Sequence, residues 1–264
     1  MQPNTYVALP PLSHKDKSIV YIGIIAIALM AWLYLFYIAA QHSRMDMSMM
    51  GMPQQAFSYH GALYDFLVLL PMWAVMMIAM MLPSILPATA VFAAFNKHKK
   101  ARAQPYVDTY TFVCGYLVAW VSCGALFALM QSGLSIAGVL DSTMKTNNLL
   151  LSGGILLAAG LYQWTSLKEV CLKNCRSPLG FFIERWREGR SGAVYMGWRY
   201  GLFCVGCCWA LMAIMFSVGT MNILWMAILS IFMLAEKIFP GSKLMRNIAG
   251  ILLICWGSYL LIGI

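Results

Sequence analysis

The stretch Met196-Gly-Trp-Arg-Tyr-Gly-Leu-Phe-Cys-Val-Gly-Cys-Cys-Trp-Ala-Leu-Met-Ala-Ile-Met215 is apolar enough to cross a bilayer, yet it carries three thiols near its middle. In a helix, Cys204, Cys207 and Cys208 stand at positions i, i+3 and i+4 and therefore share one face. Lipid offers a thiol cluster no partner, whereas the interior of a helix bundle can use soft sulfur for metal binding or redox chemistry. The stretch predicts a membrane helix whose thiols face other helices. Tight packing of small residues, which Gly197, Gly201 and Gly206 favour, is the alternative.

The composition extends this interpretation to the whole chain. Of its 264 residues, 61% are hydrophobic and 10% are charged, which is far from the average of soluble proteins. We expect an all-α polytopic membrane protein that forms a single helical membrane domain over residues 1–264. The net charge of +9 does not predict a nucleic-acid partner, because basic residues gather in the inner loops of membrane proteins.

Hydropathy predicts seven spans, and the charges between them predict their orientation. Most of the 18 Lys and Arg residues fall in segments 15–17, 97–102, 168–190 and 237–246, which lie on one side if the spans alternate. The positive-inside rule then predicts an N-in/C-out topology. A cytoplasmic loop is expected at 166–192, with an amphipathic helix at 176–190 lying on the inner leaflet. The expected spans are 19–40, 71–95, 108–131, 148–165, 195–218, 221–239 and 246–264.

A methionine-rich segment follows the first span. The extracytoplasmic loop predicted at 41–60 has five methionines within eight positions, flanked by a histidine. Thioethers favour Cu(I) and need no deprotonation to bind it, so the loop is a candidate for copper capture. A loop that dips its methionines into the membrane surface is the alternative. The candidate ligands are His42, Met45, Met47, Met49, Met50 and Met52.

The second span carries a further methionine group, Met76, Met77, Met80 and Met81, immediately before two prolines. Pro83 and Pro87 lack backbone donors and predict a kink in this span. A broken helix at membrane depth is tolerated against protein or a water-lined cavity. The methionines therefore predict either core packing or a sulfur track that leads inward from the loop.

The remaining cysteines do not indicate a disulfide framework, since none of the eight falls in an expected outer loop. Cys171 and Cys175 form a C-x-x-x-C pattern on the expected cytoplasmic side, where neighbouring Lys and Arg would lower a thiol pKa. With a rise of about 1.5 Å per residue, the thiols of the 196–215 stretch and Met80 and Met81 reach similar depths from opposite sides. The two sulfur groups meet if their helices are neighbours.

Two charged positions have less specific interpretations. Glu236 and Lys237 stand together at the inner end of the sixth span, where a surface ion pair is the simplest expectation. Arg199 lies one turn before Cys204, where it either pairs with a thiolate or carbonyl or extends to the inner surface.

Several ordered motifs resemble one bacterial family. They are Trp73–Ser84, Tyr162–Gly180, Gly201–Met212, Met221–Met226 and the pair Glu236-Lys237, and together they cover about residues 65–260. The chain resembles the uncharacterised family of predicted metal-binding integral membrane proteins, a domain of unknown function. The resemblance implies a helical membrane protein that binds metal, without an assigned reaction. Family members often carry His where this chain has Tyr200, which favours an all-sulfur site here.

These patterns together favour a Cu(I)-handling protein of the bacterial inner membrane, which captures copper, transports it or delivers it to a copper enzyme. The expected partners are the lipid bilayer and either a copper-dependent membrane enzyme or a periplasmic copper carrier. Motifs typical of nucleotide-binding or hydrolytic enzymes are absent from the sequence, and a binding role is favoured over an enzyme. A membrane thiol or copper-dependent oxidoreductase is one alternative, and a non-catalytic subunit of a membrane complex is another.

Overall fold

The computed structural model describes residues 14–48, 62–101, 106–140, 146, 148–220, 222–239 and 242–263, without the side chains at 14–17, 42–48, 62, 63, 98, 100, 101 and 242. This part of the chain consists of helices, the connections between them and one isolated bridge between Leu140 and Thr146. In chain order the helices are α1 (His14–Ser48), α2 (Ala62–Met81), the 3-10 helix η1 (Leu82–Ile85), α3 (Leu86–Ala101), α4 (Thr109–Ile136), α5 (Leu149–Tyr162), α6 (Ser166–Arg176), α7 (Pro178–Arg185), α8 (Gly189–Ala213), α9 (Met215–Val218), α10 (Ile223–Ile238) and α11 (Ser242–Ile262).

The helices confirm a polytopic membrane protein, with fewer candidate spans than the sequence predicted. Five segments are long and apolar enough to cross a membrane, and a sixth results if α5 and α6, bent by 62°, act as one span. The difference from seven arises largely at α10, whose 16 residues extend about 24 Å. This length is shorter than the roughly 30 Å of hydrocarbon in a bilayer. The five segments are Ser18–Gln41, Tyr64–Lys97, Thr109–Ile136, Gly189–Val218 and Lys243–Ile262.

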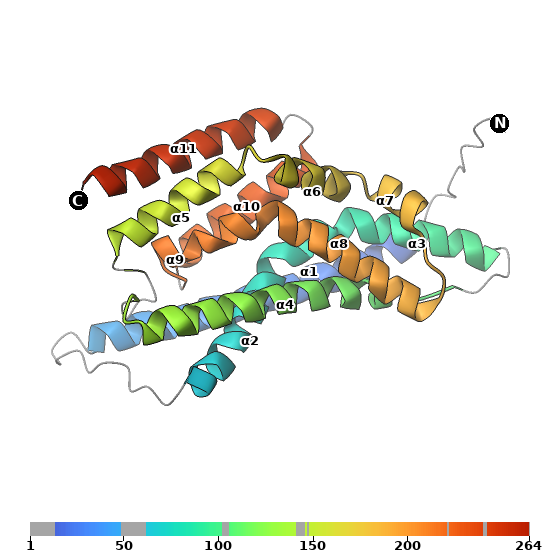
Figure 1. Cartoon of the computed structure of the whole chain (residues 1–264). Helices are drawn as coiled ribbons and strands as arrows, with labels where there is room; N and C mark the ends of the chain where they lie inside the picture. Colours follow the sequence, from blue (N-terminus) through green and yellow to red (C-terminus); the bar gives the residue numbers. More distant parts are fainter. Residues whose placement is uncertain are drawn as a thin grey trace.

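The helices lie side by side along one long axis. Figure 1 shows α1, α4, α8 and α11 running in one direction along the bundle, and α3, α5 and α10 running in the other. Polar side chains cap the starts of the shorter helices: Asn148 accepts backbone N–H bonds in α5, Thr165 in α6 and Asn222 in α10. Because α6 has its own capped start at Thr165, the chain turns there instead of continuing α5.

The predicted kink in the second span is confirmed as a 3-10 turn between α2 and α3. Pro83 cannot donate to the carbonyl of Ala79 four residues earlier, and Trp32 Nε1 supplies that bond from α1 at 3.1 Å. The next two carbonyls also accept side-chain bonds, Met80 O from Ser230 Oγ at 3.3 Å and Met81 O from Tyr116 Oη at 3.1 Å. Side chains of neighbouring helices thus satisfy the backbone groups freed by the break, as the membrane interior requires.

Small residues allow α4 and α8 to approach until their backbones touch. A Cβ added to Gly115 of α4 would lie 2.1 Å from the carbonyl oxygen of Val194. One added to Gly197 of α8 would lie 2.0 Å from the carbonyl oxygen of Phe112. Close glycine packing of this kind is a standard means of helix association in membranes. It fixes the thiol-bearing helix α8 against the middle of the bundle.

Two expected segments have different boundaries in the structure. Helix α1 continues to Ser48, so the first part of the predicted loop at 41–60 is helical. The amphipathic helix expected at 176–190 is shorter, because α7 ends at Arg185 and α8 begins at Gly189. Phe181 and Phe182 of α7 are buried against the protein, whereas Ile183 and Leu179 are exposed.

Candidate metal centre

The three thiols of α8 face the interior of the bundle. Cys204, Cys207 and Cys208 are 1–2% exposed, whereas Trp209 and Leu202 of the same helix are 44% and 42% exposed. The prediction that this face is turned away from lipid is therefore confirmed. The thiols of Cys207 and Cys208 donate to the carbonyl of Cys204, at 3.1 and 2.8 Å, so the three sulfurs stay grouped around one turn of helix.

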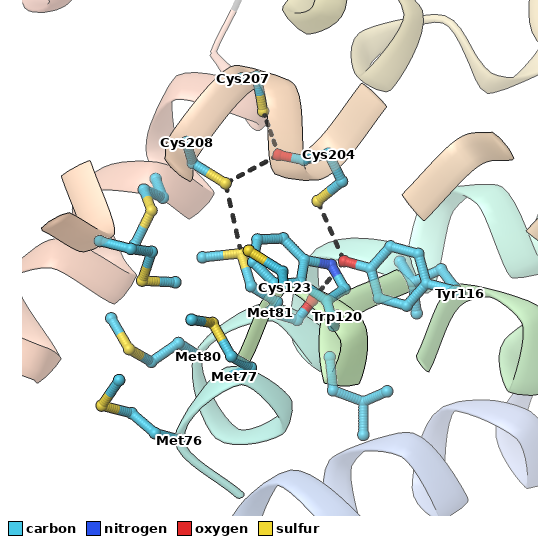
Figure 2. Packing of buried hydrophobic residues seen from close by; sticks show 14 of the residues in the cluster. Met76, Met77, Met80, Met81, Tyr116, Trp120, Cys123, Cys204, Cys207 and Cys208 are labelled. Atoms are coloured by element: carbon cyan, nitrogen blue, oxygen red, sulfur yellow. Dashed lines mark hydrogen bonds between the residues drawn. The ribbon is translucent and has the colours of Figure 1, made fainter. Parts of the chain in front are cut away.

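The methionine-bearing helix meets this thiol group at Met81, the last residue of α2. The Sγ of Cys208 lies 3.9 Å from the Sδ of Met81, which places two sulfurs from separate helices in contact (Figure 2). Figure 2 shows Met80, Met77 and Met76 farther from the thiols than Met81, with Met76 the farthest. All four methionines are 0–2% exposed. The condition for the two sulfur groups to meet, that their helices are neighbours, is therefore fulfilled at Met81.

A lysine that the sequence analysis placed at the surface lies among these sulfurs. The Nζ of Lys237, from α10, is 2.9 Å from Cys204 Sγ, 3.7 Å from Met81 Sδ and 3.0 Å from Ser84 Oγ. Tyr116 Oη lies 3.1 Å from the same Cys204 sulfur. A positive charge therefore occupies the space between the α2 kink and α8.

Its neighbour Glu236 is buried and pairs with another residue, so the expectation of a surface ion pair at these two positions is wrong. Glu236 is 2% exposed, and its two carboxylate oxygens each accept a 2.9 Å bond from Lys168 of α6, which is 0% exposed. Lys168 also donates to Gln163, and Arg176 donates to the backbone carbonyl of Glu236. Consecutive residues of a helix point about 100° apart, so one faces α6 and the other faces α8.

Cys171 and Cys175 lie on the opposite flank of α8, where both are buried at 7% exposure. The thiol of Cys175 interacts with those of Cys204 and Cys207, and the thiol of Cys171 interacts with that of Cys207. Cys171 fits against Gly206, where an added Cβ would lie 2.7 Å from its sulfur. The C-x-x-x-C pair is therefore a buried extension of the thiol group rather than an exposed dithiol.

Two of the cations expected to activate this pair are engaged elsewhere, Lys168 with Glu236 and Arg176 with the Glu236 carbonyl. Arg199, considered as a thiolate partner, instead donates to Tyr195 Oη at 3.2 Å. Tyr200 Oη donates to the carbonyl of Cys175 at 2.9 Å and so ties α8 to α6. One thiol that the sequence analysis did not single out, Cys123 of α4, is close enough to Cys204 for an electrostatic interaction.

The donor set favours a mixed thiol and thioether site. Within the described ranges, no three Cys, His, Asp or Glu side chains are arranged so that they would hold a metal ion. The described cysteines are free thiols. Methionine at the α2 kink therefore has to complete any set built on Cys204 and Cys208. The ligands predicted at Met49, Met50 and Met52 lie outside the described residues, as do the side chains of His42, Met45 and Met47.

Comparison with known proteins identifies the family to which the chain belongs. No curated protein and no solved structure matched the chain. The family model described as "PpoB2: Copper chaperone" matches residues 70–260, which include all eight cysteines and the four methionines before the kink. The methionine-rich segment at 42–52 falls before the matched region. Since the match covers well over half of the 264 residues, the chain belongs to the PpoB2 family of copper chaperones.

Proposed function

We propose that this copper chaperone binds Cu(I) inside the membrane, with Cys204 and Cys208 of α8 and Met81 of α2 as ligands. The observation that carries the proposal is the position of Lys237, whose ammonium lies 2.9 Å from one of these sulfurs and 3.7 Å from another. The sulfurs thus surround a place where a monovalent cation already resides. Thiolate and thioether donors prefer Cu(I) to the harder divalent ions.

Copper and the Lys237 ammonium are then alternative occupants of one position. Two cations in contact at low dielectric repel strongly, so loading moves the ammonium away from Cys204. Ser84 Oγ, at 3.0 Å from Nζ, offers this side chain a polar partner beside the site. A cysteine that binds Cu(I) as a thiolate releases its proton, and this loss offsets the charge of the incoming ion.

The other predicted sulfurs extend this site in two directions. Met76, Met77 and Met80 form a thioether path along α2, and the segment with His42, Met45, Met47, Met49, Met50 and Met52 captures copper at its start. Cys207, Cys171 and Cys175 continue the path on the far flank of α8, where Cys175 interacts with Cys204. Transfer between neighbouring soft ligands lets copper move without becoming a free ion.

We further infer an N-in/C-out protein of the bacterial inner membrane, which receives copper on the outer side. The start of α1 and the end of α11 lie at opposite ends of the bundle in Figure 1, which supports this topology. The clustering of basic residues in the connections at one end supports it as well. The partner is a copper-dependent membrane enzyme or a periplasmic copper carrier.

The test removes two thiols at a time. The Cys204→Ser/Cys208→Ser variant is purified anaerobically, loaded with Cu(I) and compared with Cys114→Ser/Cys255→Ser, whose thiols are exposed on other helices. We expect the first variant to lose one equivalent of tightly bound copper in competition with a Cu(I) chelator, and the second to retain it. Equal copper retention by both variants would overturn the assignment.

A further inference from the structure

A pocket of about 290 Å³ lies at the start of α8, against α7 and the connection between the two helices. This volume is at the lower end of the range of small-molecule sites. Three arginines, Arg185, Arg187 and Arg199, line it together with Trp186, Tyr195 and one carboxylate, Glu184. The pocket is separate from the sulfur site, because none of its lining residues is a proposed copper ligand.

Aromatic rings, rather than carboxylates, hold the arginines in place. The guanidinium of Arg187 lies 4.1 Å from the ring centre of Tyr195, and that of Arg185 lies 5.0 Å from the ring centre of Phe203. Arg199 contacts the Tyr195 hydroxyl. Stacking on a ring leaves the in-plane N–H donors of a guanidinium available for another partner.

One donor in the pocket wall has no partner at all among the described residues. Arg185 Nη1 is buried and unbonded, although a buried charged donor without an acceptor is costly. The adjacent carboxylate, Glu184, lines the pocket. Glu188 is engaged by Lys99 and by Trp186 Nε1, and the Lys99 ammonium holds the pKa of Glu188 below its usual value. With three arginines and one carboxylate in its lining, the pocket therefore presents excess positive charge to a ligand.

Its depth matches the headgroup region of a bilayer. The candidate span Gly189–Val218 has 30 residues, or about 45 Å of helix, which exceeds the hydrocarbon thickness by about ten residues. The excess fits at the arginine-bearing start, where Trp186, Tyr195 and Trp198 provide the aromatic residues typical of the membrane interface.

We propose that this pocket binds a phosphate group of an anionic ligand, which its depth identifies as the headgroup of an anionic phospholipid. Guanidinium forks match phosphate oxygens in geometry and charge. Basic pockets beside membrane helices bind anionic headgroups in the same way. The site lies on α7 and α8. A bound lipid would therefore hold the connection between these two helices at the membrane surface.

The test uses the full chain in detergent and native mass spectrometry. Phosphatidylglycerol, phosphatidylcholine and inorganic phosphate are titrated separately, and the phosphatidylglycerol complexes are then challenged with excess inorganic phosphate. We expect wild-type protein to retain phosphatidylglycerol at least tenfold better than phosphatidylcholine, and Arg185→Gln/Arg199→Gln to lose this preference. Arg190→Gln, an exposed neighbour outside the pocket, is the matched control and should behave as wild type.

Variants that fail to fold are recognised by their thermal unfolding, and Arg185→Lys/Arg199→Lys, which keeps both charges, should restore part of the preference. Displacement of the lipid by inorganic phosphate would keep the phosphate site but assign it to a soluble ligand. Equal retention of both lipids by wild type, with no phosphate bound, would overturn the proposal. An equal loss in Arg190→Gln would overturn it as well, because general surface charge would then explain the binding.

Discussion

The buried ion pair between Lys168 of α6 and Glu236 of α10 provides the sharpest test of how the site is held together. Both carboxylate oxygens of Glu236 accept bonds of 2.9 Å from one ammonium, and the two side chains are 0% and 3% exposed. The pair fixes the helix turn that also carries Lys237. Glu236→Gln removes the negative charge while it preserves the shape of the side chain.

The expected loss follows from the geometry. At an effective dielectric of about 20, unit charges about 3 Å apart attract by about 5–6 kcal/mol. Removal of one partner from a buried pair typically costs about 3–5 kcal/mol, because the other charge stays buried. We expect Glu236→Gln to lose stability in that range. The apolar double variant Lys168→Met/Glu236→Leu should recover all but about 1–3 kcal/mol of this loss, because Gln163 still loses its donor.

The assay is equilibrium unfolding in mixed micelles of mild detergent and SDS, which gives a free energy for each variant. Lys243→Gln is the matched control, because Lys243 of α11 is 76% exposed and forms its pair with Glu169 of α6 at 3.7 Å. Exposed pairs contribute little, so we expect a change below about 1 kcal/mol there. If Glu236→Gln were as stable as this control, the buried pair would not hold α10 to α6.

Two further predictions concern helix packing and the cation position. Gly115→Ala should destabilise the protein by about 1–3 kcal/mol, because its new Cβ would meet the Val194 carbonyl. Gly133 lies in the same helix with open space around it, so Gly133→Ala should be neutral or stabilising by up to about 1 kcal/mol. A similar loss of unfolding free energy in both variants would refute the close contact. Lys237→Met should bind Cu(I) at least tenfold more tightly in chelator competition, since it replaces the competing ammonium with a thioether. Weaker binding would contradict a shared cation position.

Local spacing was sufficient to predict the side of α8 that faces the bundle and the break in the second span. Cys204 and Cys208 are one turn apart, so both must face the same way, and a proline pair interrupts any helix. The common depth of Met81 and the thiols also followed, because the helical rise is constant. Each of these features depends only on the spacing of residues within one helix or on the direction in which that helix runs.

The polar half of the site could not be predicted in this way, because its members Lys237, Tyr116 and Ser84 come from three helices. Lys237 and Glu236 look like the charged end of a span, and their burial depends on how α10 is rotated against α6 and α8. Tyr116 and Ser84 are ordinary residues in sequence, and their position beside Cys204 arises from the glycine packing of α4 and the bend at η1. Such contacts are set by tertiary packing, which hydropathy and spacing do not encode.

The central claim is that thiols of α8 and the methionine at the α2 kink bind one copper ion together. X-ray absorption at the copper edge, on selenomethionine-substituted protein loaded with one equivalent of Cu(I), tests it directly. We predict a first shell of sulfur with a selenium contribution that disappears in Met81→Leu and persists in Met72→Leu. A shell of nitrogen or oxygen ligands, or a selenium contribution that survives in Met81→Leu, would contradict the claim.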